Sequence, residues 1–239
     1  MKKNLCWLVF CIDKSGSMTK IKEDMIGGFN SYIDSQIKAN VGEARVFGYA
    51  FDTYYEILFE NVDINLAPRL TVENYVPRGG TALYDSLGKT ITDIGKKLAD
   101  MDEADRPEKI LVVTITDGED NSHLSGNEFT EYSSAQVRKM VNHQTDVYNW
   151  DFAYIGANQD VWAVGASMGI SGSASNLGYA ATAAGTAYAF DSLSKSSTFY
   201  RSALVSKSAG DKFAFVPDPA DSAAFNSPLV DVKLPKKKS

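Results

Sequence analysis

Five side chains in the first half of the chain carry oxygen atoms and stand where an apolar run ends or a helix begins. They are Asp13, Ser15, Ser17, Thr81 and Asp117. Mg²⁺ prefers six oxygen ligands, keeps some of its waters and uses few carboxylates. Hydroxyls and carboxylates match that preference, whereas this set is poor material for a nucleophile or an acid–base pair. The residue types therefore predict a site for a small, hard divalent cation.

The places of these residues in the chain indicate how they can meet. Residues 13–17 read Asp-Lys-Ser-Gly-Ser, and Gly16 allows a tight turn between the two serines. Asp117 follows a second apolar run, and Thr81 follows a pair of glycines. In an open parallel sheet, ligands bind outside the carboxyl ends of the strands, where the strand order reverses. We therefore expect the three segments to converge at that edge.

Simpler roles are open for each of these residues. Asp and Ser are common helix N-caps, so residues 13–17 are also consistent with a cap and its neighbouring turn. Thr81 suits the N-cap of the helix that follows it. Asp117 suits a plain turn at the end of a strand. The joint presence of all three segments favours the metal site over these separate roles.

Charged residues near these positions also leave two interpretations open. Glu119 and Asp120 either tune the site or bind a second cation, or they belong to a solvated loop, which is the interpretation we favour. Arg78 either contacts an acidic partner or is an ordinary surface charge. His123 and His143 have no Cys or carboxylate at ligand spacing, so we expect each of them on the surface or at a cap.

Apolar patterns along the chain predict alternating strands and helices. Strands are predicted for residues 5–12, 44–51, 54–59, 109–116, 151–156 and 177–181. Helices are predicted for residues 18–40, 81–101, a segment ending near 143, 158–168 and 183–205. The alternation is typical of an α/β fold with a mostly parallel sheet. The link at residues 52–53 is short enough for a hairpin, so one strand pair should be antiparallel.

Composition sets broad limits on partners and organisation. The chain has 239 residues, of which 44% are hydrophobic, and a net charge of −6. We expect one large domain over residues 1–206 and an extended arm over 207–239 that ends in the basic cluster Lys236-Lys237-Lys238. The acidic balance does not favour a nucleic-acid partner. No apolar run is long enough to span a bilayer, so we expect no membrane partner.

The first apolar run resembles the start of a signal peptide, but three features argue against one. The run is short, no small-residue cleavage site follows it, and Asp13 interrupts it. Cys6 and Cys11 are five residues apart, which on a strand places them on opposite faces and prevents their pairing. Two buried free thiols fit a reducing compartment. We therefore predict a cytoplasmic protein whose first apolar run is a buried strand.

Three motifs in order resemble those of von Willebrand factor type A domains. The motifs are Asp13-x-Ser15-x-Ser17, Gly79-Gly80-Thr81 and Thr116-Asp117-Gly118. The resemblance covers roughly residues 4 to 205, and the segments at 156–160 and 179–182 look like bacterial and phage-encoded members. It implies a Rossmann-like doubly wound sheet with helices on both faces.

The resemblance also implies a metal-ion-dependent adhesion site that binds Mg²⁺ or Mn²⁺. By this resemblance, Ser15 and Ser17 ligate directly, Thr81 ligates directly in the high-affinity state, and Asp13 and Asp117 act mainly through water. A Glu or Asp of a partner protein fills the remaining position. In members that switch, the last helix shifts, which in this chain is the helix predicted for residues 183–205.

Three functions from different classes follow. The first is a divalent-cation-dependent module that docks an acidic residue of a partner protein. The second is a structural component of a phage or bacterial assembly, in a virion for example, with a non-essential metal site. The third is a Mg²⁺-dependent phosphoryl-transfer or hydrolytic enzyme, which we do not favour because Ser15 stands where an aspartyl phosphatase needs a second Asp and no phosphate-binding Gly-Lys loop occurs.

Overall fold

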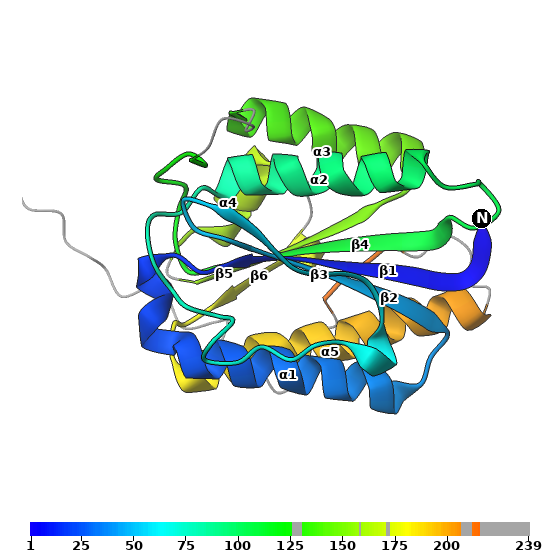
Figure 1. The fold of residues 1–239 in the computed structure, drawn as a ribbon, viewed down its shortest axis with the longest axis horizontal. Coiled ribbons are helices and arrows are strands. Elements are labelled where there is room, and N and C mark those ends of the chain that lie inside the picture. The colour runs from blue at the N-terminus through cyan, green and yellow to red at the C-terminus, as the bar shows by residue number, and fades with distance from the viewer. Residues whose placement is uncertain (126–130, 158, 171–172, 207–211, 216–239) are drawn as a thin grey trace, which may run out of the picture.

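Six strands form one sheet within the residues that the computed structural model describes, which are 1–125, 131–157, 159–170, 173–206 and 212–215 (Figure 1). In chain order they are β1 (Lys2–Asp13), β2 (Glu43–Phe51), β3 (Tyr55–Asp63), β4 (Pro107–Thr116), β5 (Asp151–Ala157) and β6 (Asn176–Tyr179). Their order in the sheet is β3-β2-β1-β4-β5-β6. Only the β2–β3 pair is antiparallel. The predicted mostly parallel sheet with one antiparallel edge strand is confirmed.

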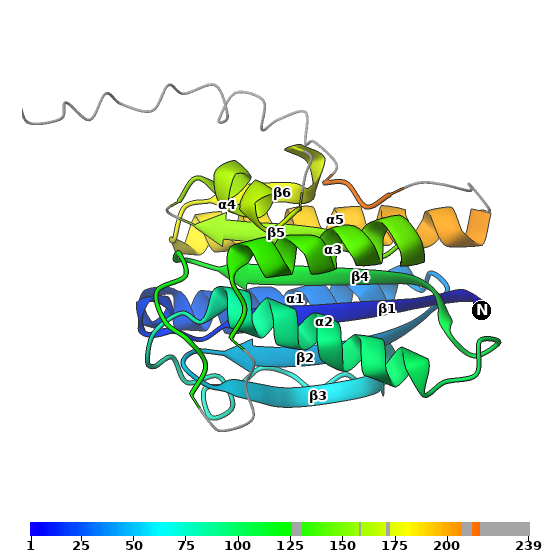
Figure 2. The same ribbon diagram turned by 90° about the horizontal axis from the view of Figure 1, so that it is seen from above.

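Helices cover both faces of this sheet. They are α1 (Lys22–Ala39), α2 (Leu83–Ala99), α3 (Ser134–Tyr148), α4 (Val161–Ser167) and α5 (Ala183–Ser206), with short 3₁₀ helices η1 (Gly16–Ile21), η2 (Ile64–Leu66) and η3 (Ser173–Ser175). In Figure 1, α1 and α5 lie below the sheet, and α2 and α3 lie above it. Figure 2 shows the strands side by side beneath α2 and α3. The predicted α/β class is confirmed. Among the described residues, no helix has the length and apolar content needed to cross a bilayer.

The central strand β1 is buried on both faces because its side chains alternate between two cores. One core lies between the sheet and helices α1 and α5, and it receives the side chains of Cys6, Leu8, Phe10 and Ile12. The other core lies between the sheet and helices α2 and α3, and it receives the side chains of Leu5, Trp7, Val9 and Cys11. The two cysteines are therefore free, buried and on opposite faces, as predicted.

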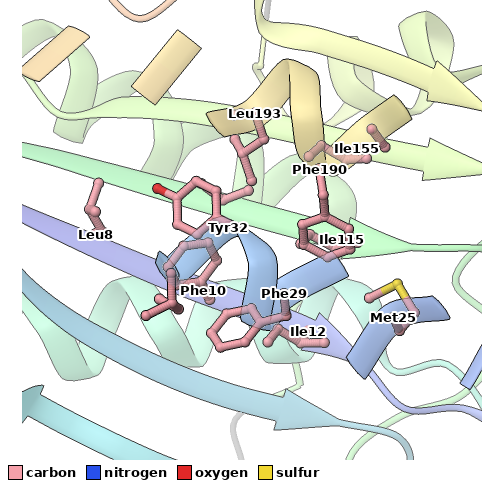
Figure 3. Close-up of a cluster of buried hydrophobic side chains, with 14 of the residues drawn as sticks. Leu8, Phe10, Ile12, Met25, Phe29, Tyr32, Ile115, Ile155, Phe190 and Leu193 are labelled. Carbon is pink, nitrogen blue, oxygen red and sulfur yellow. The ribbon is translucent and has the colours of Figure 1, made fainter. Parts of the chain in front are cut away.

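The core between the sheet and helices α1 and α5 is built around aromatic side chains from β1, α1 and α5 (Figure 3). The ring of Phe10 meets the rings of Phe29 and Tyr32 edge-on, with centroid distances of 5.2 and 5.3 Å. Phe190 of α5 lies directly over Gly28 of α1, where a Cβ would stand 2.1 Å from the Phe190 ring. Because Gly28 has no side chain, α1 and α5 can approach closely at this point.

A buried arginine joins the other end of α5 to α1. Arg201 is 2% exposed, and its Nη1 donates to Oε1 of Gln36 at 3.0 Å. Its Nη2 donates to the carbonyl oxygen of Val41 at 2.6 Å. Gln36 in turn donates from Nε2 to the carbonyl oxygen of Ser194 at 2.9 Å. The cation sits at the carboxyl end of α1, where the helix dipole and free carbonyl groups favour positive charge.

Several predicted boundaries differ from the structure. The helix predicted from residue 18 begins as η1, and α1 starts at Lys22. The helix predicted from Thr81 starts at Leu83. Large apolar side chains on a short helix are more often part of the core. Met168, next to the end of α4, is buried, but Trp162 is 45% exposed. Because α4 is short and turns Val161 to the sheet, the adjacent Trp162 points away from it.

Part of the predicted C-terminal arm lies against the domain. Phe213 is 3% exposed, and its N–H donates to Oδ1 of Asp151 at 3.1 Å. The N–H of Phe215 donates to the carbonyl oxygen of Ala174 at 2.6 Å. Residues 207–211 and 216–239 of the arm, with its basic cluster, lie outside the described residues, and so does residue 158, where a helix is predicted to begin.

The close approach of α1 and α5 generates a matched pair of tests on neighbouring glycines. A Cβ at Gly28 meets the Phe190 ring, whereas a Cβ at Gly27 meets no atom within 4 Å. We expect Gly28→Ala to lower the free energy of unfolding by about 1–3 kcal/mol because the helices must separate. Gly27→Ala should raise it by up to about 1 kcal/mol through helix propensity. Urea unfolding of both variants measures the difference, and equal effects would contradict the described packing.

Candidate metal centre

Three loops meet at the edge where the carboxyl ends of the parallel strands lie. Asp13 ends β1 and Thr116 ends β4, and these two strands are neighbours with Ile12 opposite Ile115. Within the sheet, β2 is the neighbour of β1 on one side and β4 is its neighbour on the other. The strand order therefore reverses at β1. The loop before α2, which contains Thr81, reaches the same edge through the Gly16 N–H, which donates to the carbonyl oxygen of Gly79 at 3.1 Å.

Asp13 is the buried centre of this arrangement. Its side chain is 0% exposed. Its Oδ1 accepts from the N–H of Ser15 at 2.6 Å, and its Oδ2 accepts from the hydroxyl of Thr116 at 2.5 Å. Burial raises the pKa of this carboxyl to about 6, the hydrogen bonds from Thr116 and Ser15 oppose the rise, and the charge of Asp117 adds to it. The folded protein therefore holds a carboxylate whose negative charge is only partly compensated.

Ser15, Ser17 and Asp117 continue outward from Asp13 as a chain of oxygen atoms. The hydroxyl oxygens of Ser15 and Ser17 are 3.0 Å apart. Ser17 donates from its hydroxyl to Oδ1 of Asp117 at 2.6 Å, across 100 residues of sequence. Ser15 is buried, Asp117 is 9% exposed and Ser17 is exposed. The chain of oxygens thus runs from the interior of the sheet edge to the solvent.

Thr81 is held beside these groups through its backbone. Its N–H donates to Oδ1 of Asn121 at 2.8 Å, and its carbonyl oxygen accepts from the N–H groups of Asn121 and Ser122 at 3.0 and 3.2 Å. A Cβ added to Gly118 would lie 3.8 Å from the hydroxyl oxygen of Thr81 and 4.0 Å from that of Ser17. The structure therefore brings all five predicted residues to one place.

The simpler roles open to these residues are filled by other groups. Ser15 precedes η1 but makes no side-chain capping bond. Ala82, and not Thr81, is the N-cap residue of α2, and it makes no side-chain capping bond. The N–H of Tyr84 in the first turn of α2 donates instead to Oδ1 of Asp120 at 3.1 Å. The expectation that Asp120 belongs to a freely solvated loop is therefore wrong, whereas Glu119 is exposed.

The turn after β4 is likewise made without the Asp117 side chain. The hydroxyl of Thr116 accepts from the N–H of Gly118 at 3.1 Å and lies 3.0 Å from the Gly118 carbonyl oxygen. Asp117 is thus free to face Ser17. Caps and turns do not consume the hydroxyls of Ser15, Ser17 and Thr81 in this structure, so they remain available as ligands.

Three supporting residues were not assigned a role from the sequence. Thr116 binds Asp13, Asn121 positions Thr81, and the buried Tyr75 donates from its hydroxyl to the carbonyl oxygen of Asp13 at 2.6 Å. A polar residue at the end of an apolar strand is a signal that identifies Thr116. Asn121 and Tyr75 lie in loops whose course the sequence does not define, so no local pattern identifies them.

A buried carboxylate of α2 anchors the segment that follows the loop after β4. Asp85 of α2 is 2% exposed and accepts from the N–H groups of Leu124 at 2.9 Å and Tyr132 at 2.6 Å. Its Oδ2 also lies 3.2 Å from Nδ1 of His123, and this hydrogen bond raises the pKa of the exposed imidazole. His123 therefore lies on the surface, as expected, and helps to fix the segment next to the candidate site.

The donor set is composed of oxygen alone. Over the part of the chain that the structure describes, no three His, Cys, Asp or Glu side chains form a group that could hold a metal ion. The candidate site instead combines two carboxylates with three hydroxyls. That chemistry suits a hard cation and does not suit a soft thiolate or imidazole site.

Comparison with known proteins supports the fold. The sequence matches no protein-family model and no curated protein. Among solved structures, the manganese-loaded TRAP protein of Plasmodium vivax is 17% identical, with a TM-score of 0.52 over 78% of this chain and 72% of that one. A von Willebrand factor type A protein from Catenulispora acidiphila is 16% identical, with a TM-score of 0.50 over 82% and 43%.

A third similar structure is proximal thread matrix protein 1 from the mussel byssus, described with a zinc-occupied MIDAS motif. It is 12% identical, with a TM-score of 0.53 over 82% of this chain and 46% of that one. The chain thus spans about half the length of the mussel and Catenulispora proteins. These likenesses show that the chain has the fold of von Willebrand factor type A domains, as the three motifs predict.

The burial of Asp13 generates a prediction for the cation-free protein. The pKa of Asp13 is raised from 3.8 to about 6, so the folded state binds this proton more tightly than the unfolded chain does. Protonation of Asp13 stabilises the folded state. This contribution is fully present below the pKa that Asp13 has in the unfolded chain, and it is lost as the pH rises through its pKa in the folded protein. Asp13→Asn keeps the shape and cannot titrate. In chelator, above pH 6, we expect it to be more stable than the unaltered protein by about 1–3 kcal/mol.

Urea unfolding at several pH values between 4 and 7.5 measures this difference. The advantage of Asp13→Asn should shrink as the pH falls towards 4. Asp146→Asn, which changes an exposed carboxylate on α3, is the matched control and should show no comparable advantage. An Asp13→Asn protein that is destabilised at every pH would contradict this account of the buried carboxylate.

Proposed function

We propose that this chain is a divalent-cation-dependent protein-binding module. In this proposal Asp13, Ser15, Ser17, Thr81 and Asp117 hold Mg²⁺ or Mn²⁺, and a partner protein completes the coordination with a Glu or Asp side chain. The observation that carries the proposal is the convergence of oxygen atoms from three loops. The hydroxyl of Ser17 lies 3.0 Å from that of Ser15 and 2.6 Å from the Asp117 carboxylate.

The chemistry of the donor set supports an acidic partner. Neutral hydroxyls from Ser15, Ser17 and Thr81 stabilise a cation without cancelling its charge, and carboxylates that act through water cancel it only in part. A carboxylate that arrives from outside then gains a strong attraction in a partly dry site. The fold relatives described as manganese-loaded and as zinc-occupied support a divalent cation in this type of domain.

Two alternatives give different results in solution. If the protein is a structural component of an assembly, virion or other, its assembly should be insensitive to chelator. If it is a Mg²⁺-dependent enzyme, it should turn over a generic phosphoester, and Asp13→Ala should abolish that turnover while the fold stays intact. We expect neither result, and we expect the module to act in the cytoplasm.

Substitution of the outward ligands tests the proposal. Ser17→Ala and Asp117→Ala each remove one side chain at the solvent end of the oxygen chain. We expect each to weaken Mn²⁺ binding at least about tenfold, while thermal unfolding without metal changes little because both groups lie at the rim. Titration calorimetry measures the affinity, and circular dichroism measures helical content and melting.

Ser31→Ala is the matched control, since it removes an exposed hydroxyl from α1 and should leave Mn²⁺ binding unchanged. Capture of partners from cell extract with Mg²⁺, compared with chelator, should then show proteins that Ser17→Ala does not retain. Equal Mn²⁺ affinity in all three variants would contradict the metal site. Collapse of the metal-free fold in either site variant would indicate a purely structural role.

A further inference from the structure

Arg78 is fastened to the loop that carries Ser15. Its N–H donates to the carbonyl oxygen of Lys14 at 2.8 Å, and Lys14 stands between Asp13 and Ser15 in the sequence. The next residue, Gly79, has a φ of +65° and accepts from the N–H of Gly16. The backbone of Arg78 is therefore held at the rim of the candidate metal centre.

The guanidinium group of Arg78 is held on two sides. Its Nε donates to Oδ2 of Asp52 at 2.8 Å, and its Cζ lies 5.5 Å from the centre of the Tyr54 ring. Asp52 is 0% exposed and is itself fixed, because its Oδ1 accepts from the N–H of Tyr54 at 2.6 Å. Since two contacts restrict the side chain, a ligand that binds it has less conformational entropy to remove.

Asp52 also sets where this guanidinium stands. It directly follows Phe51, which is the register partner of Asp13 in the parallel β1–β2 pair. The contact between Arg78 and Asp52 is therefore at the carboxyl end of the strand next to β1. The anchor of the guanidinium and the anchor of the candidate metal centre lie on adjacent strands of the same sheet edge.

The outer side of the guanidinium faces solvent. The Arg78 side chain is 57% exposed, and the Nη groups make no hydrogen bond to any residue that the structure describes. The neighbouring cation Lys14 differs, since its side chain is 4% exposed and pairs with Glu56. Arginine carries its donors in a planar fork that matches a carboxylate. Only Nε is committed to Asp52, so the fork on the other side is available.

One apolar group lies beside this fork. The ring of Tyr54, which is 51% exposed, has its centre 5.5 Å from Cζ of Arg78. Apolar surface beside a charged pair lowers the local dielectric constant and strengthens the interaction. An ordinary surface arginine has neither a buried carboxylate behind it nor an exposed aromatic ring beneath it.

We propose that Arg78 binds a second carboxylate of the partner, next to the carboxylate that completes the metal coordination. The partner segment then carries two acidic residues close together in its sequence, and Arg78 selects such a segment over one with a single acidic residue. This inference rests on the proposed function, since it adds a second contact to the same docking event.

Model peptides test the inference directly. The probes are Ac-Gly-Glu-(Gly)n-Glu-Gly-NH₂ peptides with zero to four central glycines, each paired with a peptide whose second Glu is replaced by Gln. Binding is measured at saturating Mn²⁺ for the unaltered protein, Arg78→Gln and Arg45→Gln. Arg45 lies near the opposite end of β2, beside Trp7 of β1, so its variant controls for the lost charge.

We expect at least one diacid peptide to bind the unaltered protein about five- to tenfold more tightly than its Gln counterpart. Arg78→Gln should reduce that advantage to less than about twofold, with unchanged affinity for Mn²⁺ and for the single-acid peptide. Arg45→Gln should keep the advantage. A Mn²⁺ affinity that falls in Arg78→Gln would indicate that Arg78 only shapes the loop, and would overturn the inference.

Two further outcomes separate this inference from the function on which it rests. If single-acid peptides bind with Mn²⁺ but no diacid peptide gains affinity, or Arg78→Gln keeps the gain, Arg78 does not read a second carboxylate and only the inference fails. If no peptide shows Mn²⁺-dependent binding to the unaltered protein, both the docking function and the inference fail.

Discussion

A carboxylate buried at the end of the central strand is the constraint on which the rest of the site depends. Asp13 is fully buried, so its charge is costly unless donors or a cation lie close to it. The N–H of Ser15 and the hydroxyl of Thr116 supply two donors, and in doing so they fix the turn of the first loop and join β1 to β4. Tyr75 adds a bond to the backbone of the same residue. The groups that compensate one buried charge are therefore also the groups that shape the loops around it.

Most of the fold follows from patterns that the sequence states locally. The alternation along β1 defines two cores, and the short link before β3 defines the antiparallel edge. The five oxygen-bearing residues of the candidate site were predicted because each stands at the end of a regular element. What the sequence does not reveal depends on contacts between distant loops. Asp120 accepts a hydrogen bond from the N–H of Tyr84 in the first turn of α2, although the two residues are 36 positions apart. The outward direction of Trp162 depends on how a short helix packs on the sheet. The start of α2 differs from the prediction for a related reason, since groups that bind the first turn of a helix need not be neighbours in the chain.

The contacts of α5 bear on whether the last helix can shift, as the resemblance to von Willebrand factor type A domains implies for members that switch. At one end Phe190 occupies the space above Gly28, and at the other Arg201 binds the carboxyl end of α1. Between them Gln36 donates to Ser194. A displacement of α5 along its axis breaks all three contacts together, and it leaves the Arg201 charge buried without its carbonyl partners. In this structure the contacts between α5 and α1 therefore extend from Phe190 to Arg201, and a shift of α5 has to replace all of them.

The separation of Cys6 and Cys11 gives each layer of the molecule its own chemical reporter. One thiol lies under α1 and α5 and the other under α2 and α3, and burial raises the pKa of both to about 12. Neither sulfur can react with an alkylating reagent until the helices above it lift, since the thiolate is the reactive form. The rate at which each thiol is alkylated therefore reports how often the pair of helices that covers it opens. A chain with only one of the two thiols distinguishes breathing of the lower helices from breathing of the upper ones.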